Sequence, residues 1–275
     1  MHDRRGQSVI ITGGSSGIGL DLARFYATAG AHVALIARAQ DKLDAAASEC
    51  RRCARSDTQK IEVLSLDVAD TSVVQQKIDA LLAHFPVPDI VILAAGVVAS
   101  RRFMEQEDEE FERILRINLS GARQMARALL PAMLAQGRGQ LCFIASLGGI
   151  VAPYGYSAYS ASKFALIGMA DALRQELYGT GVGVTVVCPP EVDTPMVAEE
   201  AKHILPQTRL LKDLGGTLQP AVVTRATVRA IDRDQRLVIP GLLAKLTAWQ
   251  FRLIPGVSHW VIRRIILWMN RRNAA

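Results

Sequence analysis

The chain has 275 residues, of which 50% are hydrophobic and 21% charged, enough to bury the core of one sizeable α/β domain and too apolar for disorder. Aromatic residues make up only 5%, so we expect no nucleic-acid partner. The net charge of +6 comes from the C-terminal region. Residues 242–275 hold six basic residues and no acidic one, while the rest of the chain carries 26 of each.

Targeting and metal-binding patterns are weak. An apolar run begins at Ser8, which leaves no room for a secretory signal, and no stretch approaches the roughly 18 apolar residues of a membrane span. We therefore expect a cytoplasmic protein. Cys50 and Cys53 form a lone C-x-x-C in a basic, helix-like stretch, with no second Cys or His pair at zinc spacing. We interpret them as ordinary helix residues and expect no metal site.

Short β-branched runs alternate with longer helical patterns. In chain order we expect a strand at 8–12, a helix at 18–29, a strand at 33–37, a helix at 41–55, a strand at 61–66, a helix at 71–85, a strand at 90–94, a helix at 111–136, a strand at 141–146, a helix at 158–178 and a strand at 182–188. This alternation predicts an α/β fold, a Rossmann-type doubly wound parallel sheet with helices on both faces. Ligands of such sheets bind beyond the carboxyl ends of the strands.

A glycine-rich turn joins the first strand to the first helix. Glycines let the backbone turn sharply and approach a pyrophosphate, and the following helix presents unpaired N–H groups to it. Any tight turn favours glycine, but the position after the first strand of a βαβ unit makes the pattern typical of a dinucleotide site. The residues that we expect to contact the dinucleotide here are Gly13, Ser15, Ser16, Gly17 and Ile18.

The end of the second strand favours one dinucleotide over the other. NAD enzymes usually carry an acidic residue there for the ribose 2′-hydroxyl, but this chain has Ala37, followed by Arg38 and Lys42. Two cations and no carboxylate favour a 2′-phosphate, and hence NADPH/NADP+. Alternatively, Arg38 is an ordinary solvated arginine. Asp67, after the third strand, either accepts a hydrogen bond from the adenine amino group or caps the next helix.

Tyr159 and Lys163 are four residues apart, so they share one face of the predicted helix. A tyrosine titrates near pH 10, about three units too high for easy proton exchange at neutrality, and a nearby cation lowers that pKa. Ser146 ends the preceding strand, where its hydroxyl can polarise the same carbonyl oxygen. Such a pair often occurs by chance on surface helices. Together with Ser146 and the glycine turn, it predicts a nicotinamide-dependent carbonyl reductase.

Residues 8–198 resemble the short-chain dehydrogenase/reductase family. The family's T-G-x-x-x-G-I-G turn is similar to residues 12–19, and its catalytic Asn, Ser, Tyr and Lys correspond to Asn118, Ser146, Tyr159 and Lys163. The resemblance implies that Tyr159 is the acid in reduction, that Ser146 orients the carbonyl, that Lys163 holds the nicotinamide ribose and that Asn118 anchors a water. It also implies that Val192 and Thr194 contact the carboxamide.

Two short segments depart from the family pattern. Ala94-Ala95-Gly96 replaces the usual N-A-G, and Pro189-Pro190 replaces the usual P-G. These changes put local stability and loop geometry in doubt, but not the chemistry.

Several segments resemble one subgroup of this family more than the family as a whole. The turn, the Ala37-Arg38 junction, residues 158–165 and residues 189–200 resemble the 3-ketodihydrosphingosine reductases, Pro189-Pro190 included. The resemblance implies NADPH-dependent reduction of the 3-keto group of a long-chain sphingoid base to sphinganine. Two alternatives stay open: a reductase or dehydrogenase of another lipid carbonyl, such as a steroid, retinoid or 3-oxoacyl group, and a non-catalytic membrane-recruited binding protein. The four intact catalytic residues argue against the last.

The C-terminal region differs in kind from the rest of the chain. We expect a catalytic domain at 1–241, with a substrate lid at about 195–220, and a cationic amphipathic helical tail at 242–275. On a helical wheel, apolar residues of 257–270 (Val261, Ile262, Ile265, Trp268 and Met269) lie opposite its arginines. This arrangement is typical of a helix in a membrane interface. We therefore predict peripheral contact with the cytoplasmic membrane face; a flap over the pocket or a contact within a homo-oligomer, the usual state in this family, is the alternative.

Overall fold

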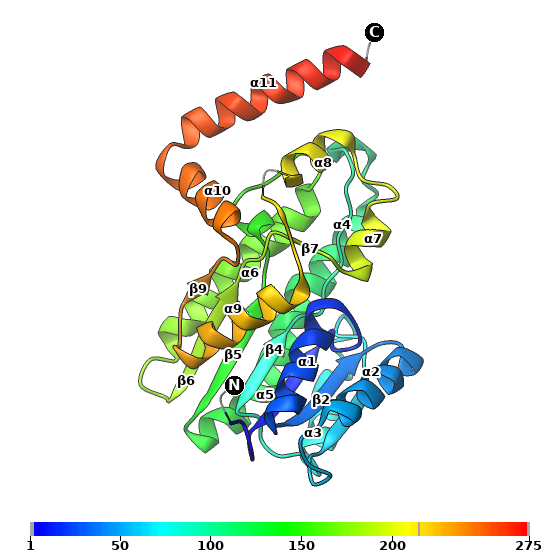
Figure 1. The fold of residues 1–275 in the computed structure, drawn as a ribbon, viewed down its shortest axis with the longest axis vertical. Coiled ribbons are helices and arrows are strands. Elements are labelled where there is room, and N and C mark those ends of the chain that lie inside the picture. Colours follow the sequence, from blue (N-terminus) through cyan, green and yellow to red (C-terminus); the bar gives the residue numbers. More distant parts are fainter. Residues whose placement is uncertain (1–2, 214, 274–275) are drawn as a thin grey trace.

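The computed structural model describes residues 3–213 and 215–273. A seven-stranded parallel sheet with strand order β3-β2-β1-β4-β5-β6-β9 forms its centre (Figure 1). The strands are β1 (Ser8–Thr12), β2 (His32–Ala37), β3 (Ile61–Ser65), β4 (Ile90–Leu93), β5 (Gly139–Ile144), β6 (Val182–Val187) and β9 (Leu237–Val238). The order reverses beside β1, as in a doubly wound fold, and confirms the predicted fold class.

Helices cover both faces of the sheet. On one face lie α1 (Gly17–Ala29), α2 (Gln40–Cys53) and α9 (Pro220–Asp232), and on the other lie α3 (Val74–Leu82), α5 (Ala122–Gln136) and α6 (Ser157–Glu176). In β1, Val9 and Ile11 pack into the first layer and Ile10 into the second, all of them fully buried. Because successive side chains of a strand point to opposite faces, a continuous apolar run fits a strand covered on both sides.

The long helix predicted at 111–136 is three segments. α4 (Asp108–Leu115) leads into a π-helical segment, η2 (Arg116–Gly121), and then into α5. Gly121 lies tightly against Val68, since a Cβ at this glycine would come within 2.7 Å of the Val68 side chain. π-Helical turns inside α-helices often mark functional sites, and this one holds Asn118.

The segment after β6 crosses over the carboxyl ends of the strands. It contains β7 (Glu191–Val192), α7 (Pro195–Glu200), α8 (Pro206–Asp213) and β8 (Thr217–Leu218), and β7 pairs with β8 in a small parallel sheet. Short 3-10 turns, η1 (Phe103–Glu105) and η3 (Leu147–Gly149), lie in the loops after β4 and β5.

The chain ends in α10 (Leu242–Leu253) and α11 (Pro255–Asn273), which lead away from the sheet, and α11 lies above α8 in Figure 1. Gln207 of α8 donates a hydrogen bond to Asn270 of α11 at 2.9 Å. Within residues 3–213 and 215–273, no helix has both the length and the apolar character needed to cross a membrane. Residues 274 and 275 of the predicted tail lie outside the described residues.

Candidate active site

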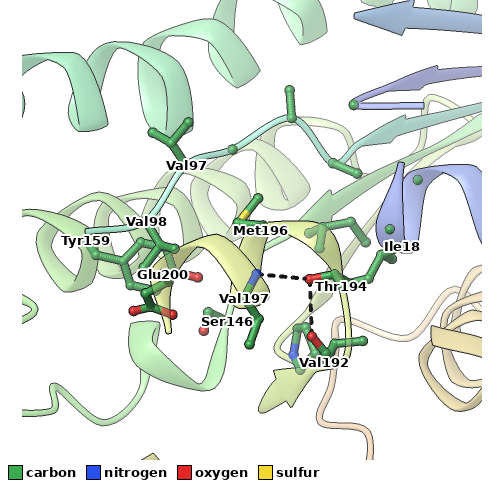
Figure 2. Close-up of a pocket in the computed structure, with 18 of the residues that line it drawn as sticks. Ile18, Val97, Val98, Ser146, Tyr159, Val192, Thr194, Met196, Val197 and Glu200 are labelled. Carbon is green, nitrogen blue, oxygen red and sulfur yellow. Dashed lines mark hydrogen bonds between the residues drawn. The ribbon is translucent and has the colours of Figure 1, made fainter. Parts of the chain in front are cut away.

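A cavity of about 410 Å³ lies at the carboxyl ends of the strands, beneath the segment that crosses over them. Figure 2 shows part of its wall. It brings together nearly all of the residues predicted from the sequence: Gly13, Ser15, Ser16, Gly17, Ile18, Arg38, Lys42, Asp67, Ser146, Tyr159, Lys163, Val192 and Thr194. Asn118 alone among the predicted residues does not line it.

The glycine turn is shaped for close approach by a ligand. Gly13 has φ +68°, and a Cβ there would lie 2.9 Å from the backbone of Ala94. At Gly19, a Cβ would lie 2.3 Å from the carbonyl oxygen of Gly13. No side chain caps the N-terminus of α1, whose first N–H groups therefore stay available at the cavity. The turn fits the pyrophosphate of a dinucleotide.

The far end of the cavity carries the predicted cations. Arg38 follows β2 directly and Lys42 lies on the first turn of α2, and both side chains are exposed at the cavity wall. Asp67 also lines the cavity, and its Oδ1 accepts a hydrogen bond from the N–H of Ala69 at 2.9 Å. The alternative expectation that Asp67 caps the next helix is wrong, because α3 begins only at Val74.

Ser146, Tyr159 and Lys163 meet where β5 ends and α6 begins. The Ser146 hydroxyl accepts a hydrogen bond from the N–H of Gly148 at 3.0 Å, and it lies close enough to the Tyr159 phenol to influence its pKa. Lys163 is buried, and its Nζ donates to the carbonyl oxygen of Ile144 at 2.9 Å. The same Nζ lies 5.8 Å from the centre of the Tyr159 ring. A phenol, a hydroxyl and an ammonium therefore converge on one wall.

Burial dominates the titration of these groups. It raises the pKa of Tyr159 to about 12, although the nearby Ser146 hydroxyl counteracts it and the carboxylate of Glu200 adds to it. The lowering of this pKa that the sequence led us to expect is therefore not found in the protein without cofactor, because burial of the phenol outweighs it. Burial lowers the pKa of Lys163 to about 8. Without a cofactor, the phenol therefore keeps its proton at neutral pH, and the lysine is close to losing its own.

Asn118 does not line the cavity, but its side chain holds neighbouring segments in place. Its Oδ1 accepts from the N–H of Val97 at 2.8 Å, and its Nδ2 donates to the Val97 carbonyl at 2.9 Å and to Ser162 Oγ at 3.0 Å. These bonds tie the loop after β4 to α6. Asn118 and Lys163 both lie against Gly96, since a Cβ at that glycine would meet Asn118 Oδ1 at 3.2 Å and Lys163 Nζ at 3.7 Å.

The two departures from the family pattern are accommodated locally. In the Ala94-Ala95-Gly96 loop, the N–H groups of Ala94 and Ala95 donate to Thr12 Oγ1 at 3.1 and 3.2 Å. The carbonyl oxygen of Pro189 accepts from the N–H of Leu147 at 2.8 Å. Both loops are therefore held by hydrogen bonds that need neither the missing amide side chain nor the missing glycine.

Thr194 begins α7 at the edge of the cavity. Its hydroxyl accepts from the N–H of Val197 at 3.5 Å and donates to the carbonyl oxygen of Val192 at 3.2 Å (Figure 2). The side chain of Thr194 therefore fixes the start of the crossing segment against β7.

Four further cavity residues had no role in the sequence-based prediction: Tyr156, Glu191, Glu200 and Lys212. Tyr156 donates a hydrogen bond to Glu200, and Lys212 Nζ contacts Glu200 at 2.6 Å and Glu191 at 2.7 Å. Tyr156 directly precedes α6, and the other three come from β7, α7 and α8. No sequence spacing links them, so only the folded chain brings them together.

Comparisons with known proteins agree with this geometry. The short chain dehydrogenase family matches residues 7–204. The 3-dehydrosphinganine reductase of Danio rerio is 36% identical over 225 residues, covering 82% of this chain and 68% of the relative. A ketoacyl reductase of Nostoc is 35% identical over 243 residues, covering 87% and 80%.

A solved short-chain type dehydrogenase/reductase from Mycobacterium marinum superposes with a TM-score of 0.78 at 28% identity, covering 86% of this chain and 95% of that one. The glycine turn and the strands β1 to β6 lie within the residues that the family matches. The chain therefore belongs to the short chain dehydrogenase family, and it is an oxidoreductase that uses a nicotinamide dinucleotide.

Proposed function

We propose that this enzyme reduces the 3-keto group of a long-chain sphingoid base, 3-ketodihydrosphingosine, to sphinganine with NADPH. One observation carries the proposal: Ser146, Tyr159 and Lys163 converge in a cavity of a chain that is about 36% identical to 3-dehydrosphinganine reductases. The same likeness recurs in relatives from Bos taurus and Arabidopsis thaliana.

Each of the four predicted catalytic residues has its own role in carbonyl reduction. When bound, NADPH supplies the hydride for the carbonyl carbon. Tyr159 donates its proton to the carbonyl oxygen, for which it must be protonated at neutral pH, as its raised pKa ensures. Because a raised pKa also makes the donation less favourable, the phenolate that forms needs stabilisation by a nearby cation. Ser146 donates a hydrogen bond to the same carbonyl oxygen, so the negative charge that develops there is stabilised. The ammonium of Lys163 stabilises the phenolate that remains, and Asn118 holds the loop beside the lysine.

The preference for NADPH rests on the junction after β2. Arg38 and Lys42 lie where a carboxylate would otherwise bind the ribose 2′-hydroxyl, and both face the cavity. A guanidinium binds a phosphate through two parallel hydrogen bonds. We expect Arg38→Ala to weaken NADPH binding about 10- to 100-fold and to leave NADH binding nearly unchanged. Equal weakening of both would contradict this role.

The α10 helix supports a contact with a lipid surface. Leu242, Leu246, Trp249 and Leu253 form one stripe along it, and they are 74%, 54%, 67% and 73% exposed. The small residues Ala244 and Ala248 occupy the opposite, buried side. Thr247 of the same helix lines the cavity. An apolar stripe therefore lies beside the route by which a long-chain substrate would reach the site.

The α11 helix shows a mixed surface. The predicted apolar arc is only partly exposed, because Val261, Ile262, Ile265 and Met269 are half-buried. The exposed side combines the large apolar residues Trp260, Leu267 and Trp268 with Arg263, Arg264 and Arg271. Tryptophans beside arginines suit the interface of an anionic membrane. We propose that α10 and α11 hold the enzyme reversibly on the cytoplasmic membrane face; a second copy of the chain is the competing occupant.

The reaction is tested by initial rates of NADPH oxidation with a panel of ketones. We expect the highest kcat/KM for 3-ketodihydrosphingosine, and much lower values for 3-oxoacyl thioesters, steroids and retinoids. The ketoacyl reductase of Nostoc makes the 3-oxoacyl group the second candidate. No turnover of the sphingoid ketone, with good turnover of a 3-oxoacyl thioester, would transfer the assignment to that class.

A further inference from the structure

A cluster of charged side chains around Glu200 lies at the cavity, beside the proposed proton donor Tyr159. Its members are Glu191, Glu200, Arg209, Lys212 and Asp213. Glu200 is only 8% exposed, yet its carboxylate lines the cavity and lies near Tyr159 (Figure 2). The charge of Glu200 raises the pKa of Tyr159, as expected for groups this close. The ring of Tyr156 packs against that of Tyr159 with centroids 5.2 Å apart, and its hydroxyl donates to Glu200. The carboxylate is therefore held in the cavity close to the proposed proton donor.

The orientation of the Glu200 carboxylate is set by its neighbours. Burial, reinforced by the negative charge of Glu200, raises the pKa of Tyr156, so this phenol stays protonated and serves as a donor. One carboxylate oxygen accepts from Tyr156 and the other from Lys212. A carboxylate has about four lone-pair positions, so Glu200 can accept further hydrogen bonds from a ligand.

Lys212 does not depend on Glu200 alone. Its Nζ also lies 2.7 Å from Glu191, whose side chain is held in turn by Arg209 at 2.9 Å and by Thr217 at 2.9 Å. Burial alone would raise the pKa of Glu191, but the hydrogen bonds from Arg209 and Lys212 outweigh it and lower that pKa to about 2. Lys212 therefore keeps a charged partner when Glu200 is shared with a ligand.

Whether this cluster binds a cation or an anion depends on which of its charged groups lines the cavity and can accept a further partner. Glu191, Glu200 and Asp213 carry three negative charges, and Arg209 and Lys212 carry two positive ones. Asp213 is the most exposed of the five, so water screens its charge, and the other four charges balance. Lys212 is already bound by two carboxylates, which leaves it poorly placed to bind an anion. A carboxylate or phosphate near the carbonyl would be repelled by Glu200, whereas an ammonium would be attracted.

We infer that Glu200 is a specificity residue that binds an ammonium group on the carbon next to the reacting carbonyl. The inference rests on the proposed function, because a 3-keto sphingoid base carries its amino group there. Tyr156 is the positioning residue that orients the carboxylate, and Lys212 shares it. Glu200 thereby distinguishes an amino ketone from a neutral or anionic ketone of the same chain length.

The test compares two substrates in one enzyme. The first is 3-ketodihydrosphingosine, and the second is the ketone of equal length that lacks only the amino group. In Glu200→Gln, we expect the ratio of their kcat/KM values to fall about 10- to 100-fold, the range for losing a hydrogen bond to a charged group. Glu200→Asp, which keeps the charge, should retain most of the preference. Glu199→Gln is the matched control, because Glu199 is exposed and pairs with Lys202 outside the cavity.

A ratio separates specificity from misfolding, because loss of folded enzyme lowers both rates equally. As a second readout, calorimetric binding of sphinganine to the NADP+ complex should weaken in Glu200→Gln and not in Glu199→Gln. An unchanged ratio with unchanged sphinganine binding would overturn the role of Glu200. If the wild type reduces the neutral ketone and not the amino ketone, the proposed function itself is wrong, whatever the variants do.

Discussion

The catalytic sheet buries its apolar side chains, whereas the C-terminal helices leave many of theirs exposed. Val9, Ile10 and Ile11 of β1 are completely buried between two helical layers. Leu242 and Leu253 of α10 are nearly as apolar, yet each leaves more than 70% of its surface in water. Burying one such side chain is worth about 1.5–3 kcal/mol, so the first region is stable by itself, whereas the second gains from an external surface. The catalytic residues lie in the first region, and the second is where we propose the contact with lipid.

The largest effect should follow from removing the proposed proton donor. Tyr159→Phe deletes only the hydroxyl, and we expect kcat to fall about 100- to 10,000-fold with NADPH affinity nearly unchanged. Steady-state rates and a fluorescence titration of NADPH measure the two quantities. Tyr178→Phe is the control, since Tyr178 is exposed and does not line the cavity. If Tyr159→Phe retained wild-type turnover, Tyr159 would not be the proton donor.

The glycine turn offers a paired comparison. Gly13 and Gly137 have nearly the same φ, +68° and +67°, but a Cβ at Gly13 would lie 2.9 Å from the Ala94 backbone, whereas none of the described atoms lies within 4 Å of one at Gly137. Gly137→Ala should therefore cost only the backbone strain, about 1–2 kcal/mol of unfolding free energy.

Gly13→Ala should cost more than that and should also weaken NADPH binding severely, because the loop after β4 must move. Urea unfolding and NADPH titration of both variants test this pair. Equal losses of stability with intact NADPH binding would mean that the turn is not a dinucleotide cradle.

A further effect concerns the buried charge of Lys163. Burial lowers the pKa of Lys163 to about 8 from its ordinary 10.5, so between these values the unfolded chain holds a proton that the folded chain has lost. The stability of the wild type should therefore rise with pH in this window, relative to Lys163→Met, by up to about 1.4 kcal/mol per pH unit.

Urea unfolding without cofactor, at about pH 7 and about pH 9.5, measures the difference. Lys245→Met in α10 is the control, because that lysine is exposed. A wild-type stability that did not rise relative to Lys163→Met would show that the ammonium of Lys163 is solvated in the folded protein.

Local signals were sufficient for the sheet and for most of the cavity wall. Apolar β-branched runs mark six of the seven strands, and the glycine turn and the Tyr159–Lys163 spacing lie within single elements. β9 was missed because Leu237 and Val238 become a strand only by pairing with Val186 and Val187 of β6. The π-helical segment was missed because its apolar pattern continues that of the flanking helices, while the contact of Gly121 with Val68 is long-range.

The cluster around Glu200 and the stripe of α10 show two different limits. The Glu200 cluster brings together side chains from the start of α6 and from β7, α7 and α8. The sequence pattern of each element alone does not predict these contacts. The spacing of Leu242, Leu246, Trp249 and Leu253 does signal an apolar stripe. Such a stripe normally faces the core. Only the structure reveals that Ala244 and Ala248 face the domain and that the stripe faces outward.

If the sheet domain carries the chemistry and α10 and α11 only bring the enzyme to lipid-borne substrate, the two roles can be separated by one measurement. A Leu246→Ser/Trp249→Ser double variant is compared with the wild type on a long-chain amino ketone in anionic vesicles and on a short, water-soluble amino ketone. We predict that the variant keeps the wild-type rate on the soluble ketone and loses at least about 10-fold on the vesicle-borne one. Equal rates on both substrates, or an equal loss on both, would contradict the account.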